Sequence, residues 1–297
     1  MAESLANLLD YPLLWRILLN SAVIAALASW LGVQVMSRGI VFLGLTVAQG
    51  AIAGMAMGFW LAATVVWLRE FPLNYPLMGS LLFVLGTVLA LGSGRLHIKE
   101  SGEEGKVAIL YITFLALAAL FLVLNPRGEG RMLRIFYGNV LTIDTTESVV
   151  LWIAASILIG VQIFRWKGFL WLSSDPLMAP AFGLAYRRYN LLFFLILGAG
   201  MVLLLHFAGL VVPLALMIVP AFTAFHTATG MKRVMAVALA LAVLPVLGAV
   251  AAGVAFTPDY PLGTIIAVST MGCSLLVYAA VKGFSLIGNG PVAGPTN

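Results

Sequence analysis

The chain has 297 residues, of which 62% are apolar and 9% are charged, and its mean hydropathy is +1.09. These values lie far from the composition of soluble domains and exclude a soluble enzyme. The net charge of +5 comes from short basic clusters between apolar runs, a pattern typical of membrane topology rather than of nucleic-acid binding. The sequence therefore predicts an all-α polytopic membrane protein.

Nine apolar stretches follow one another along the chain, and a spanning helix needs about 20 residues. They cover approximately residues 13–35, 43–68, 77–91, 107–124, 148–164, 191–205, 209–224, 234–256 and 263–281. Only residues 206–208 separate the sixth from the seventh, so eight spans are the alternative count. No Pro-rich linker divides the sequence, and we expect one membrane domain over residues 1–297 with a loop at about 165–190.

Basic residues are unevenly shared between the two sets of alternating loops. One set contains Arg38, Arg95, Lys99, Lys106, Arg165, Lys167, Arg187, Arg188, Lys232, Arg233 and Lys282; the other contains Arg16, Arg69, Arg127, Arg131 and Arg134. The positive-inside rule places the richer set in the cytoplasm. This orientation puts the N-terminus outside and the C-terminus inside.

Small residues recur every four positions in the second stretch, at Gly50, Gly54 and Gly58. Such a face lets two helix backbones approach closely, and we favour close packing over contact with a substrate.

The loop from Trp166 to Tyr189 contains signals for a short helix at about residues 176–182. Asp175 suits the N-cap, Pro176 suits the first turn, and Gly183 can end the helix in a left-handed conformation. The helix would carry three apolar side chains outside the bilayer: Leu177, Met178 and Phe182. It therefore needs either a partner protein or the lipid interface to cover them.

The residues needed for other mechanisms are missing from the spans. All acidic residues fall in loops or at span ends, which disfavours a secondary carrier driven by protons or sodium. No phosphate-binding loop and no nucleophile paired with a base occurs, so we expect neither an enzyme nor a cofactor, and any ATPase is a separate chain. The three histidines have no metal-ligand spacing, although His206 could contact a passing cation.

Five short motifs resemble, in order and spacing, the zinc/manganese/iron ABC transporter permease family. They are Met36–Gly50, Phe136–Leu141, Ser174–Gly183, Gly209–Ala221 and Tyr260–Thr264. The resemblance covers about residues 30 to 280. It implies a type II ABC importer permease in a bacterial plasma or inner membrane.

The same resemblance implies partners. Two copies of the chain would pair with two cytosolic ATPase subunits and receive substrate from an extracytoplasmic binding protein. The segment from Asp175 to Gly183 would dock into the ATPase, so the six coupling residues are Asp175, Pro176, Leu177, Met178, Phe182 and Gly183.

The chain departs from the family at positions that the resemblance assigns to the metal path. The family usually has Asp and His where this sequence has Leu45 and Gln49, and Asn139 replaces another Asp. We therefore expect Leu45, Gln49, Asn139 and His206 to line the path, with no metal ligands assigned. The substrate would be a transition metal ion or a metal chelate, and a non-metal solute is the alternative.

Overall fold

The computed structural model describes most of the chain. The described residues are 12–65, 74–92, 103–125, 130, 143–169, 186–256 and 261–288. Within these ranges all regular structure is helical, which confirms the all-α prediction. The nine long helices are α2 (Pro12–Ser37), α3 (Val41–Thr64), α4 (Tyr75–Gly92), α5 (Glu103–Val123), α7 (Thr145–Phe164), α9 (Tyr186–Ala208), α10 (Val211–Thr227), α11 (Met231–Phe256) and α12 (Leu262–Gly288).

Each predicted apolar stretch coincides with one of these helices. Seven of the helices are long and apolar enough to cross a membrane, whereas the apolar parts of α4 and α10 are shorter. Two predicted boundaries are wrong. Helix α3 ends at Thr64 rather than near residue 68, because Val65 is extended. Residues 206–208 belong to α9, and the break comes at Gly209, whose φ of 71° is left-handed and suits glycine.

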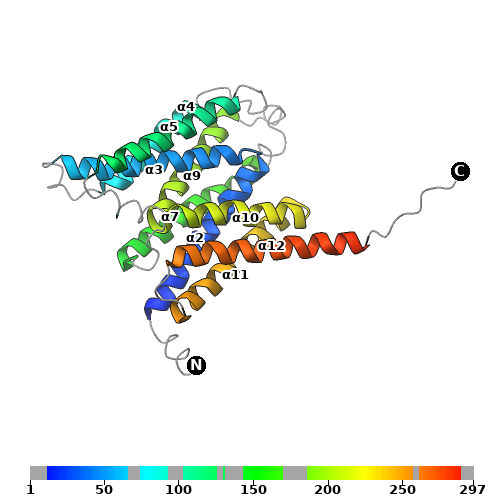
Figure 1. Cartoon of the computed structure of the whole chain (residues 1–297). Helices are drawn as coiled ribbons and strands as arrows, with labels where there is room; N and C mark the ends of the chain where they lie inside the picture. Colours follow the sequence, from blue (N-terminus) through cyan, green and yellow to red (C-terminus); the bar gives the residue numbers. More distant parts are fainter. Residues whose placement is uncertain are drawn as a thin grey trace.

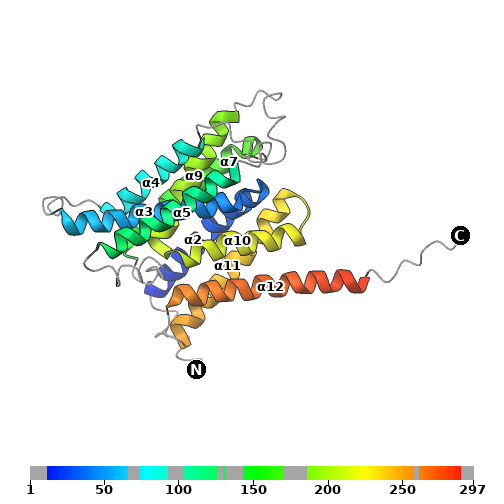
Figure 2. The same ribbon diagram turned by 45° about the horizontal axis from the view of Figure 1, so that its top comes forward.

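The helices form an inner layer that other helices cover. Helix α3 packs against α4, α5 and α9, while α2 packs against α7, α10 and α11; α12 covers α10 and α11 (Figure 1). Figure 2 shows α3, α4, α5 and α9 grouped on one side of α2, and α10, α11 and α12 on the other. About 70% of the spanning parts of α2, α3 and α9 are buried, against 11% for α5. Helices α2, α3 and α9 therefore make the centre of the bundle.

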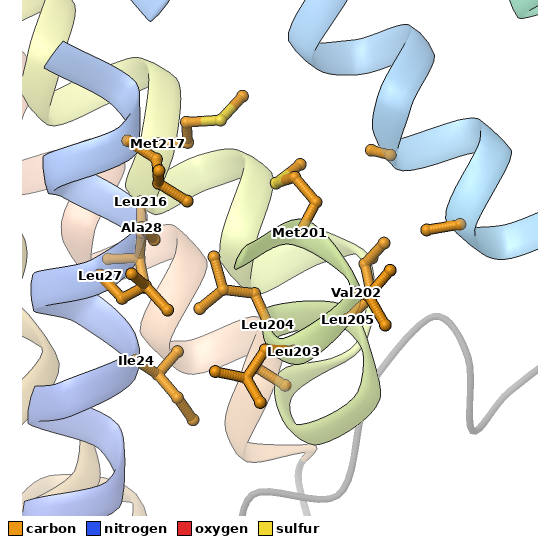
Figure 3. Packing of buried hydrophobic residues seen from close by; sticks show 14 of the residues in the cluster. Ile24, Leu27, Ala28, Met201, Val202, Leu203, Leu204, Leu205, Leu216 and Met217 are labelled. Carbon is orange, nitrogen blue, oxygen red and sulfur yellow. The ribbon is translucent and has the colours of Figure 1, made fainter. Parts of the chain in front are cut away.

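The core of the bundle lies where α2, α9 and α10 meet. Ile24 and Leu27 of α2 face Leu204 of α9, and Leu216 and Met217 of α10 lie beside them (Figure 3). All five side chains are almost completely buried. Dense packing of this kind is what holds helices together in lipid, where no hydrophobic driving force acts between them.

Glycines allow two pairs of helices to approach at backbone distance. A Cβ atom built at Gly54 of α3 would lie 2.6 Å from the carbonyl carbon of Gly79 in α4, and one at Gly58 would lie 2.6 Å from the carbonyl carbon of Tyr75. Gly32 of α2 lies equally close to the backbone of Met217 in α10. The glycine face of the second stretch is therefore a helix-packing face, as predicted.

Charged and polar side chains divide between the two ends of the bundle. We call one end the basic end, after the described side chains Arg38, Lys106, Arg165, Lys167, Arg188, Lys232, Arg233 and Lys282. At the opposite end, Arg16 donates a hydrogen bond of 2.7 Å to the Thr145 hydroxyl. This separation agrees with alternating loops, and the positive-inside rule points the basic end to the cytoplasm.

The outer helices expose large apolar side chains around the middle of the bundle. Ile112 of α5, Ile153 of α7 and Leu276 of α12 have 63%, 56% and 72% of their surface exposed. A soluble protein would not leave so many such groups in water, whereas lipid solvates them. The described surface is therefore that of a multi-pass membrane protein.

Candidate translocation path and coupling region

Leu45 and Gln49 lie on α3, one helical turn apart. Their spacing of four residues puts both on one face of the helix. Leu45 is half-buried and the Gln49 side chain is 9% exposed. Among the described residues, none forms a hydrogen bond with the Gln49 amide, while the neighbouring Thr46 hydroxyl is already bonded to the Phe42 carbonyl at 3.0 Å. Gln49 is thus a buried polar group on an inner helix whose amide has no hydrogen-bond partner among the described residues.

The chemistry of this face is neutral. Leucine offers no ligand atom, and glutamine offers one carbonyl oxygen and one NH₂ group. Among the side chains that the structure describes, the acidic ones are Asp144 and Glu147, both exposed at the start of α7. The same residues include no group of three or more His, Cys, Asp or Glu side chains that could hold a metal ion. An amide can bind a solute or a coordinated metal, but it supplies no charge to a bare cation.

His206 lies at the opposite end of the bundle from the start of α3. Its Nε2 atom is 3.5 Å from Nδ2 of Asn74, the residue that precedes α4, and its ring contacts Phe207 with centroids 5.0 Å apart. Gln49 is eight residues from the start of α3, about 12 Å along its axis. The structure therefore places Gln49 and His206 at different depths rather than in one site.

The other predicted site residues lie outside the described residues. These are Asn139 and the six coupling residues Asp175, Pro176, Leu177, Met178, Phe182 and Gly183. The segments that flank the predicted coupling loop are described, and both lie at the basic end.

The flanks of that loop meet through aromatic rings. Phe169, which follows α7, packs edge-on against Tyr189 of α9 with ring centroids 6.1 Å apart. Arg165 donates a hydrogen bond of 3.3 Å to the Tyr189 hydroxyl. The guanidinium of Arg38, the residue after α2, lies over the Phe193 ring at 3.5 Å and is 5.9 Å from the Phe169 ring. From the sequence, Arg38 was one of the basic loop residues and a member of the Met36–Gly50 motif, with no contact predicted for it.

A second polar contact, also missed from the sequence, ties α2 to α7 near the basic end. The Gln162 carbonyl oxygen accepts a hydrogen bond of 2.8 Å from the indole N–H of Trp30, and it also accepts one from the Gln34 amide. Both glutamines are buried. Trp30 also packs edge-on against Trp166 with centroids 5.9 Å apart. No spacing rule links residues more than a hundred positions apart, so only the fold reveals this contact.

The buried inner helices, the apolar outer surface and the basic end define a multi-pass membrane protein. The profile of the ABC 3 transport family matches residues 10–282. The chain belongs to this family, and it is a membrane permease subunit of an ABC transporter rather than an enzyme.

Curated relatives agree with this assignment. The manganese transport system membrane protein MntC of Listeria monocytogenes is 25% identical over 235 residues, covering 79% of each chain. The chelated iron transport system membrane protein YfeC of Yersinia pestis is 24% identical over 242 residues, covering 81% of this chain and 78% of that protein.

The fold is similar to two solved structures. PsaBC from Streptococcus pneumoniae in complex with Fab superimposes with a TM-score of 0.76 at 19% identity, covering 94% of this chain and 95% of the other. An inward-facing putative metal-chelate type ABC transporter gives a TM-score of 0.61 at 16% identity, covering 89% and 85%. The predicted fold class, an all-helical polytopic membrane protein, is therefore confirmed, and the chain shares its fold with these two structures.

Proposed function

We propose that this chain forms the membrane path of an importer for manganese, iron or zinc, taken up as ions or as chelates. The observation that carries the proposal is the family match over residues 10–282, together with relatives named for manganese and chelated iron transport. Membership of an ABC transport family also favours ATP-driven import over the secondary carrier considered from the sequence.

The proposed assembly contains two copies of this chain, two cytosolic ATPase subunits and an extracytoplasmic binding protein. Its basic end faces the cytoplasm, and the segment from Asp175 to Gly183 docks into the ATPase. The position of Phe169 and Tyr189 supports this arrangement, because they bring both flanks of that segment together at the basic end. Residues 1–297 act as one membrane domain.

The proposed path runs along the α3 face that carries Leu45 and Gln49, with Asn139 and His206 as further lining residues. This face supports a chelate more than a bare cation, because its described groups are neutral. A non-metal solute delivered by a dedicated binding protein is the second candidate, and the same neutral face favours it.

The first experiment measures cellular manganese, iron and zinc in the native host with and without this gene, under limitation of each metal. The host supplies the matching ATPase and binding protein. Loss of one metal, restored when the gene is supplied on a plasmid, is the expected result. Unchanged contents of all three metals would refute a metal importer and favour the non-metal solute.

A second experiment asks whether the α3 face is the path. The double variant Leu45→Asp with Gln49→His would place a carboxylate and an imidazole on that face, and we expect several-fold higher uptake of free Mn²⁺. The matched control, Leu45→Asn with Gln49→His, has nearly the same size but lacks the carboxylate charge. Equal uptake by the two variants at equal abundance in the membrane would mean that this face does not contact the ion.

A further inference from the structure

Arg38 stands where three parts of the basic end converge. It is the first residue after α2, in the turn that leads into α3, and its side chain is half-buried. Its guanidinium carbon lies 3.5 Å from the centroid of the Phe193 ring, and Phe193 is 1% exposed. A planar cation over an aromatic face is attracted by the ring quadrupole, and the attraction is stronger where water is excluded. Arg38 therefore joins the α2–α3 turn to α9.

The aromatic rings beneath Arg38 connect it to both flanks of the coupling loop. Phe169 packs against Phe193 with centroids 6.5 Å apart and against Tyr189 with centroids 6.1 Å apart. Arg165 donates a hydrogen bond to the Tyr189 hydroxyl. Phe169 and Tyr189, which flank the predicted coupling loop on either side, are therefore joined to Arg38 through packed aromatic rings.

The turn that follows Arg38 is stiff enough to pass a displacement of these rings to α3. Gly39 has a left-handed φ of 68°; its N–H donates to the Met36 carbonyl at 3.0 Å, and the Ile40 N–H donates to the Val35 carbonyl at 3.2 Å. These two bonds are those of a Schellman motif, which fixes the path of the chain at a helix end. Helix α3 begins at Val41. Gln49 lies about 12 Å further along this rigid helix.

We propose that Arg38 is a positioning residue that transmits movement of the ATPase-docking loop to α3 through its contact with Phe193. This inference rests on the proposed function, which assigns ATPase docking to the loop. A purely structural Arg38 would affect abundance and stability alone. A transmitting Arg38 affects the amount of substrate moved per ATP hydrolysed.

The first test uses the complete transporter with its ATPase and binding protein in proteoliposomes, and measures ⁵⁴Mn²⁺ uptake and ATP hydrolysis in the same preparation. We expect Arg38→Gln and Phe193→Leu each to lower uptake per ATP by about threefold to thirtyfold, the range that corresponds to a cation–π contact. The double variant should lower uptake per ATP no more than either single variant, because both substitutions remove the same contact. Arg38→Lys keeps the charge and should recover part of the ratio.

The control is Arg233→Gln, which removes an exposed cation from the same end without touching α9; its ratio should equal that of the wild type. Unchanged ratios in Arg38→Gln and Phe193→Leu, or losses that multiply in the double variant, would overturn the inference. If the transporter does not assemble with Arg38→Gln, Phe193→Leu still tests the inference, because it keeps Arg38 and removes the aromatic ring that Arg38 contacts.

A second readout does not depend on the substrate. Spin labels at the exposed residues Thr64 of α3 and Ser156 of α7, in a Cys273→Ser background, report on α3 movement when ATP and vanadate are added. The ATP-dependent change in label distance should occur in the wild type and disappear in Arg38→Gln. A change that persists in Arg38→Gln, or ATP hydrolysis by the wild-type transporter without any change, would overturn the inference. Failure of the wild-type chain to bind an ATPase would instead refute the proposed function.

Discussion

Replacing Gly54 by alanine tests whether backbone contact holds α3 against α4. A methyl group at this position would lie 2.6 Å from the Gly79 carbonyl carbon and 2.8 Å from the Ser80 Cα atom. Carbon atoms pack at about 3.5–4.0 Å, so the two helices must part by about 1 Å. Both obstructing groups are backbone atoms, and no rotation of a side chain can relieve the contact.

The expected cost follows from comparing this variant with a glycine that has free space. Gly86 of α4 is exposed, and a Cβ atom there meets nothing within 4 Å. Gly86→Ala should be neutral or gain up to about 1 kcal/mol from helix propensity. Gly54→Ala has the same gain in helix propensity, but overpacking against α4 lowers its unfolding free energy by about 1–3 kcal/mol. The difference in unfolding free energy between the two variants isolates the overpacking cost.

The assay is equilibrium unfolding of the purified chain in mixed micelles titrated with SDS, followed by tryptophan fluorescence. A difference of 1–3 kcal/mol changes the ratio of folded to unfolded protein by about 5- to 150-fold. Gly79→Ala should behave like Gly54→Ala, because its Cβ atom would meet the Gly54 backbone. Equal unfolding midpoints for Gly54→Ala and Gly86→Ala would refute the reasoning, because they would mean that α3 and α4 are not held at backbone distance.

Two further predictions concern polar contacts between helices. Gln162→Leu removes the shared acceptor of Trp30 and Gln34, so it should lower the unfolding free energy by about 1–3 kcal/mol in the same SDS titration. Gln162→Leu with Gln34→Leu should recover part of that loss, and no recovery would argue against a direct contact between the two glutamines. Cysteines at Asn74 and His206, joined by a short thiol cross-linker in a background without the native cysteine, should block uptake while ATP hydrolysis continues; undiminished uptake would show that α4 and α9 need not separate.

Hydropathy was sufficient to locate the helices but not all their ends. The apolar run that begins near residue 191 misses the first turn of α9, which begins at Tyr186. A helix continues past the apolar layer for as long as its backbone hydrogen bonds can form, so polar residues such as Arg188 and Asn190 extend it. Gly209, by contrast, ends α9 through its left-handed backbone, whereas hydropathy placed the break at residues 206–208 and Gly209 at the start of the next stretch.

The side-chain contacts that matter for function could not be predicted from one sequence. In a membrane protein both the lipid-facing and the core-facing side of a helix are apolar, so the hydrophobic pattern does not say which faces meet. The pairing of Gln34 with Gln162, and of Arg38 with Phe193, depends on how helices far apart in sequence pack together. The family resemblance could select Leu45 and Gln49 as expected path residues because that motif lies within one helix, and their role stays a prediction.

The positions of Gly54, Arg38 and Asn74 together suggest how movement at one end of the bundle reaches the other. Gly54 and Gly58 hold α3 against α4 at backbone distance, so α4 must follow any tilt of α3. Arg38 precedes α3 at the basic end, where its guanidinium lies over the Phe193 ring and where the proposed coupling loop would act on it. Asn74 immediately precedes α4 at the opposite end, where its amide contacts His206 of α9. A tilt of α3 that starts at Arg38 would therefore change the distance between Asn74 and His206. We expect this distance to be the first to increase when the transporter opens toward the outside.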